Sequence, residues 1–416
     1  MRMKFNRSSQ LLLVFAASLL VASLLTACSQ LTQTLTVDFV FVASSKAAGP
    51  NNYGEIDVFE VNSESGRMRQ IPASPFPSGG RYPSAEAVSS DNGSLFVANE
   101  DDNTIVQFVI GNDGKLYPYN TVNTPGVFPL AIAANAANLF VVDTYQPLPT
   151  CSTAAPCAGS IAVFPLTAAT KTLPVAIGTP VTNSSNNANY WPLTLAGSST
   201  DVIVPTGVNL PPSGSYVYVT AYDSSVTPHV GYVFGFSVGA GGVLTPLAGS
   251  PFSAGSQPSA IASYSSNGSV YVYVTDLKNG NVLGYSVAAG ALTPLAGSPF
   301  SAGNAPSAIV VDPSFPFAYV ANSTDGTVTA YSISSGVLTS LGAYSAGVQP
   351  VAIGIDPSTN HFLYTANFLS NNVSSFELNQ TAGTLLDGQY SPYASNAAPT
   401  AIAAIPHAGT GSGIQP

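Results

Sequence analysis

The sequence predicts an all-β protein: a seven-bladed β-propeller of four-stranded antiparallel blades, closed into a ring by its C-terminal strand. One observation is internal repetition, because residues 244–255 recur letter for letter at residues 292–303. A second is the recurrence of short segments rich in β-branched and aromatic residues along the chain. The third is the content of 37 glycines and 33 prolines, which suits many turns between short strands. Self-similarity at a fixed period is typical of repeat architectures.

One complete repeat is clearest between residues 306 and 339. Its strand-like segments are residues 307–311, 317–322, 326–332 and 336–339, and Gly, Pro, Asn or Asp separates them. Four short strands joined by tight turns form one antiparallel sheet, which is the blade of a propeller. At about 50 residues, the repeat is longer than the roughly 40–45 residues of a WD-type blade, so the excess lies in loops.

The first and the second strand of this repeat each recur seven times. The first-strand segments are residues 84–88, 130–133, 193–195 (with 201–204 as the alternative), 259–262, 307–311, 351–355 and 400–403. The second-strand segments are residues 39–43, 95–99, 139–143, 216–220, 270–276, 317–322 and 362–367. Because the chain opens with a second strand and ends with a first strand, we expect the last strand to complete the first blade. Such closure leaves no exposed sheet edge.

The domain boundaries follow from these strands and from the N-terminal segment. We expect the propeller to cover residues 38–406, with a tail at residues 407–416. Ahead of it, three basic residues among the first seven precede an apolar run from residue 11 to residue 25. This order is typical of a secretory signal peptide, here residues 1–27. The run of about fifteen residues is shorter than the roughly 20 that cross a bilayer as a helix, so we expect cleavage and export.

The end of the signal peptide resembles the bacterial lipobox, in which a cysteine receives a lipid and becomes the first residue of the mature protein. The matching residues are Leu25, Thr26, Ala27 and Cys28. We therefore expect a lipid anchor on Cys28, a tether over residues 28–37 and attachment to the cell envelope, since several acyl chains give stable anchoring. The residue after the cysteine is serine instead of aspartate, which favours the outer membrane. The alternative is an ordinary secretory signal in which Cys28 has no special role.

Charge and composition exclude several classes of partner. The chain has 10 basic and 20 acidic residues, and the signal peptide contains three of the basic ones and none of the acids. The mature charge is therefore 7 − 20 = −13, which excludes a nucleic-acid partner because phosphate backbones need Lys and Arg. The sequence contains no nucleotide-binding loop and no zinc-spaced His and Cys set, so we expect no cofactor. We expect a monomer.

Two local features concern metals and disulfides. Residues 100–103, Glu-Asp-Asp-Asn, carry oxygen ligands but lack the spaced pattern of a calcium loop, so we expect no metal site. Cys151 and Cys157 remain once Cys28 is lipidated, and their spacing in an exported chain predicts a disulfide. The alternative is two free thiols in one loop.

The ends of four second strands carry a related motif: Phe-Val-Ala-Asn at 96–99, Tyr-Val-Thr-Asp at 273–276, Tyr-Val-Ala-Asn at 319–322 and Tyr-Thr-Ala-Asn at 364–367. With the repeated Gly-Ser-Pro-Phe segments, this pattern resembles the lactonase-like, or Tyr-Val-Thr-Asn type, seven-bladed propellers over residues 38–406. That family includes 6-phosphogluconolactonase-like and muconate-lactonising enzymes and many exported proteins of unknown role. The resemblance implies the fold and leaves the activity open.

The connections that precede each first strand should meet the turns between second and third strands at the mouth of the central channel. Aromatic rings and amides gather there and suit a neutral polar ligand such as a glycan. The predicted ligand-binding residues are Arg81, Tyr82, Phe128, Trp191, Gln257, Asn304 and Gln349. In the alternative, residues before proline only shape turns, the aromatic rings plug the channel, and Arg81 forms a surface ion pair.

Two functions remain open at this stage. The first hypothesis is a binding module for a glycan or an envelope protein. The second is a lactone hydrolase, which needs a proton-handling group and a cation for the developing oxyanion; Arg81, His229 and Glu100 are the candidates. Lone loop histidines are usually solvated, which is the alternative for His229. A phosphorylated substrate would need several Arg or Lys, and this mouth offers Arg81 and Lys278, so we expect a non-phosphorylated lactone.

Overall fold

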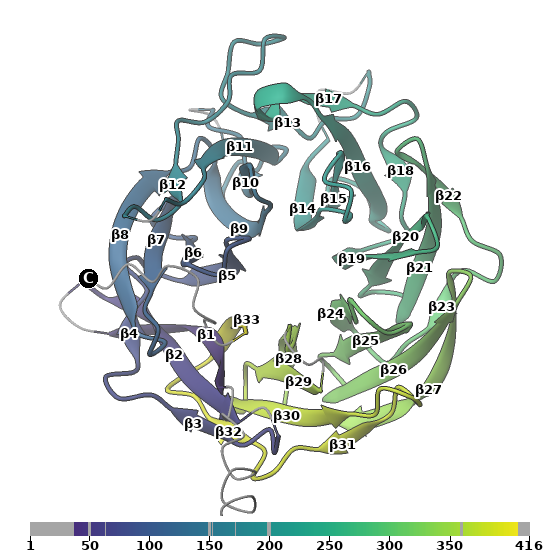
Figure 1. Ribbon diagram of the computed structural model, residues 1–416. Coiled ribbons are helices and arrows are strands. Elements are labelled where there is room, and N and C mark those ends of the chain that lie inside the picture. The colour runs from purple at the N-terminus through teal and green to yellow at the C-terminus, as the bar shows by residue number, and fades with distance from the viewer. Residues whose placement is uncertain are drawn as a thin grey trace, which may run out of the picture. The chain divides into compact units, whose positions relative to one another are not determined.

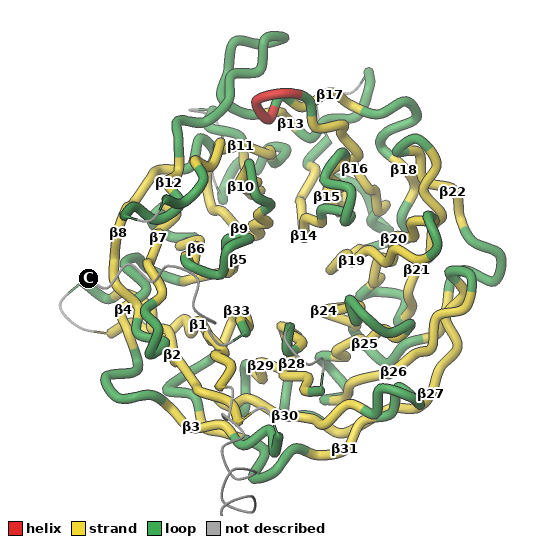
Figure 2. Tube along the Cα trace, in the orientation of Figure 1, coloured by secondary structure: helices red, strands yellow, loops and turns green. Residues whose placement is uncertain are grey.

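The structure is a computed structural model that describes residues 37–406, apart from residues 49–50, 63, 149–150, 152, 171, 198–200 and 358–360. Seven small antiparallel sheets stand around a central axis, so the prediction of a seven-bladed β-propeller is confirmed (Figure 1). Strands and loops alternate around the ring, and the one helical element in the described ranges is a short 3-10 helix, η1 (Ala240–Gly242) (Figure 2). Within the same ranges, no helix is long and apolar enough to cross a membrane.

Each blade has four strands that follow one another outward from the axis, and five blades add a short strand beside the third one. Blade 1 contains β33 (Pro399–Ile405), β1 (Val37–Ala48), β2 (Tyr53–Asn62), β3 (Met68–Gln70) and the short β4 (Phe76–Pro77). Blade 2 contains β5 (Pro83–Val88), β6 (Ser94–Asn99), β7 (Thr104–Ile110) and β8 (Leu116–Asn123). Blade 3 contains β9 (Val127–Ala134), β10 (Asn138–Tyr145), β11 (Ser160–Thr167), β12 (Ala176–Ile177) and the short β13 (Trp191–Pro192).

The remaining blades follow the same order. Blade 4 contains β14 (Ile203–Asn209), β15 (Tyr216–Asp223), β16 (Val230–Val238), β17 (Leu244–Pro246) and β18 (Phe252–Ser253). Blade 5 contains β19 (Pro258–Ser266), β20 (Ser269–Asp276), β21 (Asn281–Ala288), β22 (Ala291–Pro294) and β23 (Phe300–Ser301). Blade 6 contains β24 (Pro306–Val311), β25 (Phe317–Asn322), β26 (Thr327–Ser334) and β27 (Val337–Ser345), and blade 7 contains β28 (Pro350–Ile355), β29 (Phe362–Asn367), β30 (Asn372–Leu378), β31 (Leu385–Asp387) and β32 (Tyr393–Ala394).

The first strand of blade 4 corrects one assignment made from the sequence. It is β14, which begins at Ile203 and overlaps the alternative segment 201–204, so the assignment of residues 193–195 was wrong. Leu193 instead follows β13, which pairs with the third strand of blade 3. Its side chain is fully buried in the apolar cluster between blades 3 and 4. The segment is apolar because it ends blade 3 against that cluster.

Both ends of the described chain build blade 1, as the order of the repeats predicts. β33 pairs antiparallel with β1, with Phe39 opposite Ile405 and Ala43 opposite Ala401. The main-chain N–H of Ser45 also donates to the carbonyl of Ala398 at 3.0 Å. The last strand thus covers the inner edge of β1 and joins the two ends of the ring.

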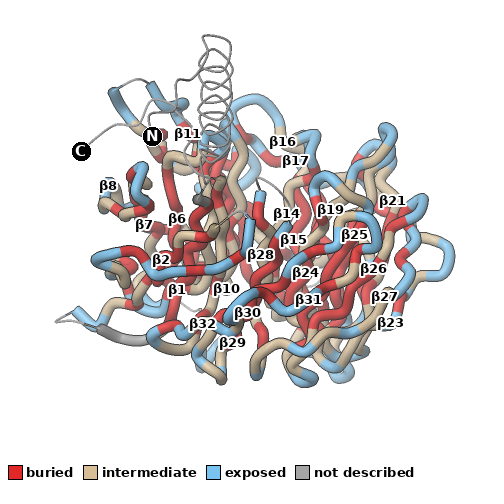
Figure 3. Tube along the Cα trace, turned by 60° about the horizontal axis from the view of Figure 1, so that its bottom comes forward, coloured by how far each residue is buried: buried red, intermediate tan, exposed pale blue. Residues whose placement is uncertain are grey.

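Two tyrosines of the repeated motif hold neighbouring blades together. Tyr273 and Tyr319 are fully buried in second strands. Their hydroxyl groups donate to the carbonyls of Gly336 (2.8 Å) and Gly383 (3.2 Å) in the outer hairpin of the following blade. Both glycines have positive φ values, +84° and +70°, which glycine adopts without strain. Buried residues follow the strands of the blades, and most exposed residues lie in the loops and in the outer strands (Figure 3).

A second set of hydrogen bonds joins the innermost strands. Each innermost strand contains a proline, and each pairing with the second strand has an irregularity at the residue after it. At four of the seven positions a Ser or Thr there donates to the proline carbonyl of the next blade. These bonds run from Ser84 to Pro129 (2.6 Å), Ser259 to Pro306 (2.5 Å), Ser307 to Pro350 (2.6 Å) and Thr400 to Pro83 (2.6 Å). We call this set the hydroxyl–proline ring.

Replacing Thr400 with valine tests the hydroxyl–proline ring where the two chain ends meet. Thr400→Val keeps the side-chain shape but removes the donor to Pro83, so we expect the free energy of unfolding to fall by about 1 kcal/mol. Urea unfolding of both proteins measures the difference. The control is Thr339→Val on the exposed outer strand β27. Equal losses in the two variants would show that the bond to Pro83 does not stabilise the ring.

Candidate functional site

The innermost strands of all seven blades line one central channel. The cavity has a volume of about 240 Å³, and three successive residues from each innermost strand form its wall. Each of these strands pairs with a neighbour on its outer side only. Alternate main-chain N–H and C=O groups of an edge strand have no strand partner, so the wall presents hydrogen-bonding groups toward the axis.

The three positions of the wall have different chemistry. The first is a hydroxyl residue in five blades, and the second is Ala or Gly in every blade. The third is an apolar β-branched residue in six blades: Ile132, Val208, Ile261, Ile309, Ile353 and Ile402. In blade 2 the third position is Glu86, which makes it the one ionisable side chain among the lining residues. The wall is therefore neutral except at this position.

The carboxyl group of Glu86 has an unusual environment. The residue as a whole is partly exposed, but both carboxyl oxygens are shielded from solvent and neither has a hydrogen-bond partner of normal geometry. Burial raises the pKa of Glu86 to about 8, and the nearby main chain of Ala43 offsets part of this effect. At neutral pH the group is therefore mostly protonated, because the buried environment disfavours its charged form.

Arg81, a predicted ligand-binding and catalytic residue, forms the surface ion pair that the sequence left open. Its Nη2 lies 2.5 Å and its Nε 2.7 Å from Asp102 Oδ1, and its main-chain N–H donates to Asp102 Oδ2 at 2.7 Å. Partial burial alone would raise the pKa of Asp102, but the hydrogen bonds and charge of Arg81 lower it. Through these bonds to Asp102, Arg81 links the connection before β5 to the turn after β6.

The predicted amide ligands take part in similar contacts. The main-chain N–H and the Nδ2 of Asn304 donate to Asp325 at 2.6 and 2.8 Å, and these bonds lower the pKa of Asp325. The main-chain N–H of Gln257 donates to Asp276 Oδ1 at 3.1 Å. Gln349 is partly exposed and has a left-handed backbone with φ of +57°. Hydrogen bonds at this mouth therefore hold the connections in place, as the architectural alternative proposes.

The predicted aromatic ligands lie in different environments. Tyr82 is 40% exposed, and Phe128 packs edge-to-face on Tyr145 with ring centroids 6.0 Å apart. Both precede the proline of an innermost strand and have positive φ values, +52° and +60°. Trp191 lies in β13 beside the third strand of blade 3 and is only 5% exposed, within the apolar cluster shared with blade 4. The structure does not bring Trp191 to the channel mouth, because it belongs to an outer strand.

The structure does not connect the other catalytic candidates to Arg81. His229 stacks on Tyr222 in blade 4 at 5.0 Å between ring centroids. The main-chain N–H of Glu100 donates to the carbonyl of Tyr82, and burial followed by the charge of Asp101 raises the pKa of Glu100. Across the part of the chain that the structure describes, no hydrogen bond or ion pair joins His229 to Arg81 or to Glu100.

Acidic residues at the ends of second strands hold the connections between blades. Asp143 is fully buried, and its Oδ2 accepts a hydrogen bond from the N–H of Gly126 at 3.1 Å while its Oδ1 has no partner. Burial raises the pKa of Asp143 to about 7. Among the described residues, no group of three or more His, Cys, Asp or Glu side chains is arranged to hold a metal ion.

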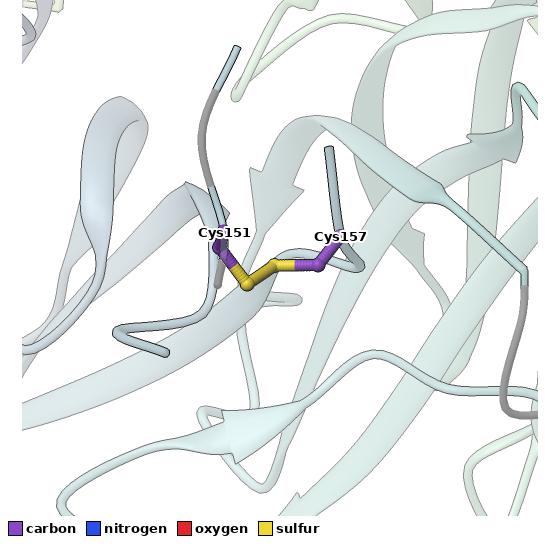
Figure 4. Close-up of a disulfide and its surroundings, with 2 residues drawn as sticks. All are labelled: Cys151 and Cys157. Carbon is purple, nitrogen blue, oxygen red and sulfur yellow. A yellow bond between two sulfur atoms is a disulfide. The ribbon is translucent and has the colours of Figure 1, made fainter. Parts of the chain in front are cut away.

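The cysteines of blade 3 form a disulfide. Cys151 and Cys157 have Cα atoms 5.5 Å apart and are bonded through their sulfur atoms in the loop between β10 and β11 (Figure 4). The predicted signal peptide, the lipid on Cys28 and the tether lie outside the described residues. The anchor and the envelope location therefore stay predictions.

Comparisons with known proteins agree with the fold. Residues 291–401 match the family model described as lactonase, 7-bladed beta-propeller. Similar solved structures are a proposed 6-phosphogluconolactonase of Bacteroides fragilis (19% identity, TM-score 0.68, covering 90% of this chain and 99% of that chain) and the periplasmic gluconolactonase of Pseudomonas aeruginosa (18%, 0.67, 89% and 99%). At such identities the structural likeness shows the fold alone. No curated protein sequence matches this chain.

The sequence contains a signal for Glu86 in the alignment of its repeats. The blade 2 segment Ser84-Ala85-Glu86 aligns with Ser-Ala-Ile at residues 259–261 and 307–309. A charged residue at a position that is otherwise Ile or Val departs from the repeat pattern. The departure would have singled out Glu86, because buried charges are rare unless they are paired or functional.

Replacing Glu86 with isoleucine should change how stability depends on pH. The folded-state pKa of about 8 lies above the ordinary 4.5, so between these values the folded protein keeps a proton that the unfolded chain releases. The free energy of unfolding therefore falls as pH rises from about 4.5 to about 8. Glu86→Ile lacks this loss. The difference between its free energy of unfolding and that of the wild type should therefore grow from about pH 4.5 to about pH 8 and stay constant above pH 8.

Chemical unfolding of wild type and Glu86→Ile at pH 4, 6 and 9 measures this effect. Part of the slope should survive in the variant, because Asp143 also has a raised pKa and remains in both proteins. The control is Glu377→Gln, at an exposed position of β30, which should keep the wild-type slope. If the free energies of unfolding of wild type and Glu86→Ile differ by the same amount at pH 4 and at pH 9, a buried, protonated Glu86 is refuted.

Proposed function

We propose, from the premise that this chain is a lactonase-like seven-bladed β-propeller, that it hydrolyses neutral, non-phosphorylated lactones in its central channel. The observation that carries the proposal is the composition of the channel wall. Its lining residues offer main-chain hydrogen-bonding groups and contain no Lys or Arg, and the one ionisable residue among them, Glu86, has its carboxyl oxygens shielded from solvent. This set suits a small uncharged polar ring.

The chemistry of ester hydrolysis matches what the wall offers. Water attacks the carbonyl carbon of the lactone, negative charge develops on the carbonyl oxygen, and the ring oxygen needs a proton as it leaves. Main-chain N–H groups commonly stabilise such an oxyanion. A carboxyl group with a pKa near the working pH handles protons efficiently. The inner strands supply the N–H groups. Glu86 is the one ionisable residue of the wall, and its carboxyl oxygens are shielded from solvent in the resting protein.

None of the Lys and Arg side chains that the structure describes lines the channel, and four of them contact another side chain elsewhere; Lys278 lies exposed in the turn after β20. Arg69 pairs with Glu60, Arg81 pairs with Asp102, and Lys115 pairs with Asp113. The guanidinium of Arg67 lies 5.2 Å from the centre of the Tyr390 ring. A phosphate group in the channel would have no cationic partner among the lining residues, and burying it there would be costly. The substrate we propose is therefore uncharged.

The names of the similar structures support the same reaction class. The Pseudomonas aeruginosa protein is a periplasmic gluconolactonase, and the Bacteroides fragilis protein is a proposed 6-phosphogluconolactonase. The hypothesis of a glycan- or protein-binding module keeps one favourable observation, which is the exposure of apolar side chains at the mouth in blade 7. Val348 is 58% and Leu369 62% exposed, and the N–H of Leu369 donates to the carbonyl of Val348.

A comparison of D-glucono-1,5-lactone with its 6-phosphate tests the proposed substrate class. We expect kcat/KM for the neutral lactone to exceed that for the phosphate at least about tenfold, because a difference of 1.4 kcal/mol in transition-state binding already gives that ratio. Proton release in weakly buffered solution measures turnover, after subtraction of the protein-free rate. Faster turnover of the phosphate would contradict the proposal. No turnover of any neutral lactone in a panel of ring sizes would favour the binding module.

A further inference from the structure

The mouth of the channel carries three apolar residues in blade 7: Val348, Phe368 and Leu369. Here the ladder between β28 and β29 continues for two residues beyond the strands. The N–H of Phe368 donates to the carbonyl of Gln349 at 2.9 Å, and the N–H of Leu369 donates to that of Val348 at 3.2 Å. Val348 precedes Val351, the first lining residue of this blade, by three residues, or roughly 10 Å along the strand. We call these three residues the blade 7 mouth patch, because they adjoin the channel wall on its mouth side.

Blade 7 departs from the repeat pattern at these positions. The main-chain bond of Phe368 recurs in five other blades, from Ser45 to Ala398, Glu100 to Tyr82, Ser224 to Val202, Leu277 to Gln257 and Ser323 to Ala305. These bonds align the mouth residues of the blades. The residues equivalent to Val348 are Ala397, Arg81, Val127, Asp201, Ser256 and Asn304, and those equivalent to Leu369 are Lys46, Asp101, Tyr145, Ser225, Lys278 and Thr324. Apart from blade 3, each of the other blades has a charged or hydrophilic residue at one or both positions.

The blade 7 mouth patch is open to solvent. Val348 is 58% and Leu369 62% exposed, and Phe368 is partly exposed. Within the described chain, none of the three belongs to the apolar clusters on either side of blade 7. In blade 3, by contrast, Phe128 packs on Tyr145. Single exposed apolar residues are ordinary on a protein surface, whereas neighbouring ones beside a channel indicate a binding surface.

Hydrogen bonds hold the main chain of the patch in place. The N–H of Val348 donates to Ser370 Oγ at 3.0 Å, in addition to the two bonds across the ladder. The connection before β28 and the turn after β29 are thus fixed to each other. A ligand that contacts the patch does not have to order these segments, which removes one cost of binding.

We propose that the blade 7 mouth patch binds an apolar chain of the lactone whose ring lies in the channel. The substrates are then neutral lactones that carry an alkyl or acyl substituent. This inference rests on the proposed function and names the substrate class of the same channel. The ring meets the hydrogen-bonding groups of the wall, and the chain extends roughly 10 Å along the line of β28 to the patch.

The size and the surroundings of the patch favour a small apolar group over a protein or a charged group. A stable protein partner covers roughly 800 Å² and about 20–30 residues on each side, far more than the patch offers. The equivalent positions of blade 6 are uncharged: Asn304, Ala305, Ser323 and Thr324. Those of blade 1 are Ala397, Ala398, Ser45 and Lys46, of which the Lys46 side chain lies outside the described structure. The patch therefore matches one apolar chain of a small ligand.

The test is a series of lactones that differ only in chain length: γ-butyrolactone, γ-hexalactone, γ-octalactone and γ-decalactone. We expect the wild-type kcat/KM to rise about two- to fourfold for each methylene group that the patch buries. The rise should come mainly from a lower KM, because the chain is bound equally in the ground state and the transition state. Proton release measures turnover, after subtraction of the protein-free rate.

A double variant shows whether the patch causes this rise. Val348→Thr with Leu369→Asn replaces apolar groups by polar ones of similar size at exposed positions. We expect the ratio of kcat/KM for γ-decalactone to that for γ-butyrolactone to fall about tenfold. The matched control is Leu386→Asn, since Leu386 is 64% exposed on the outer strand β31. This control should keep the wild-type ratio.

The outcomes separate this inference from the proposed function. If the wild type hydrolyses lactones without a gain from chain length, or if the double variant keeps the wild-type ratio, the role of the patch is refuted while the proposed function stands. Turnover of D-glucono-1,5-lactone without turnover of any γ-lactone has the same meaning. If the wild type hydrolyses none of these lactones, both are refuted. If the double variant does not fold, Leu369→Asn alone decides by the same ratio.

Discussion

Contact between neighbouring innermost strands is the constraint on which this structure depends. Each of these strands contains a proline next to a local irregularity in pairing, and four of them donate a hydroxyl hydrogen bond to the proline of the next blade. The ring thereby places the same three strand positions around one channel in all seven blades. Blade 2 departs from the pattern at the third position, where Glu86 replaces the Ile or Val of the other six blades.

Most of the fold could be predicted from the sequence because the repeat is regular. The two strands nearest the axis recur with similar residues, and the order of the chain ends predicts the pairing of β1 with β33. The first strand of blade 4 could not be assigned in this way, since a long insertion follows β12 and contains apolar residues that pack against blade 3. The same insertion contains Trp191, which the sequence predicts at the channel mouth and the structure places in β13, beside the third strand of blade 3.

The candidate site was harder to predict, for physical reasons that differ between residues. Arg81 looked free because its partner Asp102 lies 21 residues away and meets it through the turn after β6. Glu86 stood out in an alignment of the repeats, but a sequence does not show whether a carboxyl group is paired. Only the packing of β5 against blade 1 shows that its oxygens are shielded and that its pKa is raised. The wall therefore contains one ionisable residue, and its carboxyl group is buried against blade 1.

The protonation of this group in the resting protein is the central claim, and it can be measured without any substrate. A carbon-13 NMR titration of protein labelled at the glutamate side-chain carboxyl carbons follows each group separately, and the spectrum of Glu86→Gln identifies the Glu86 signal. The account predicts that this signal titrates with a midpoint near pH 8. A midpoint near the ordinary value of 4.5 would contradict it, because Glu86 would then be charged at neutral pH.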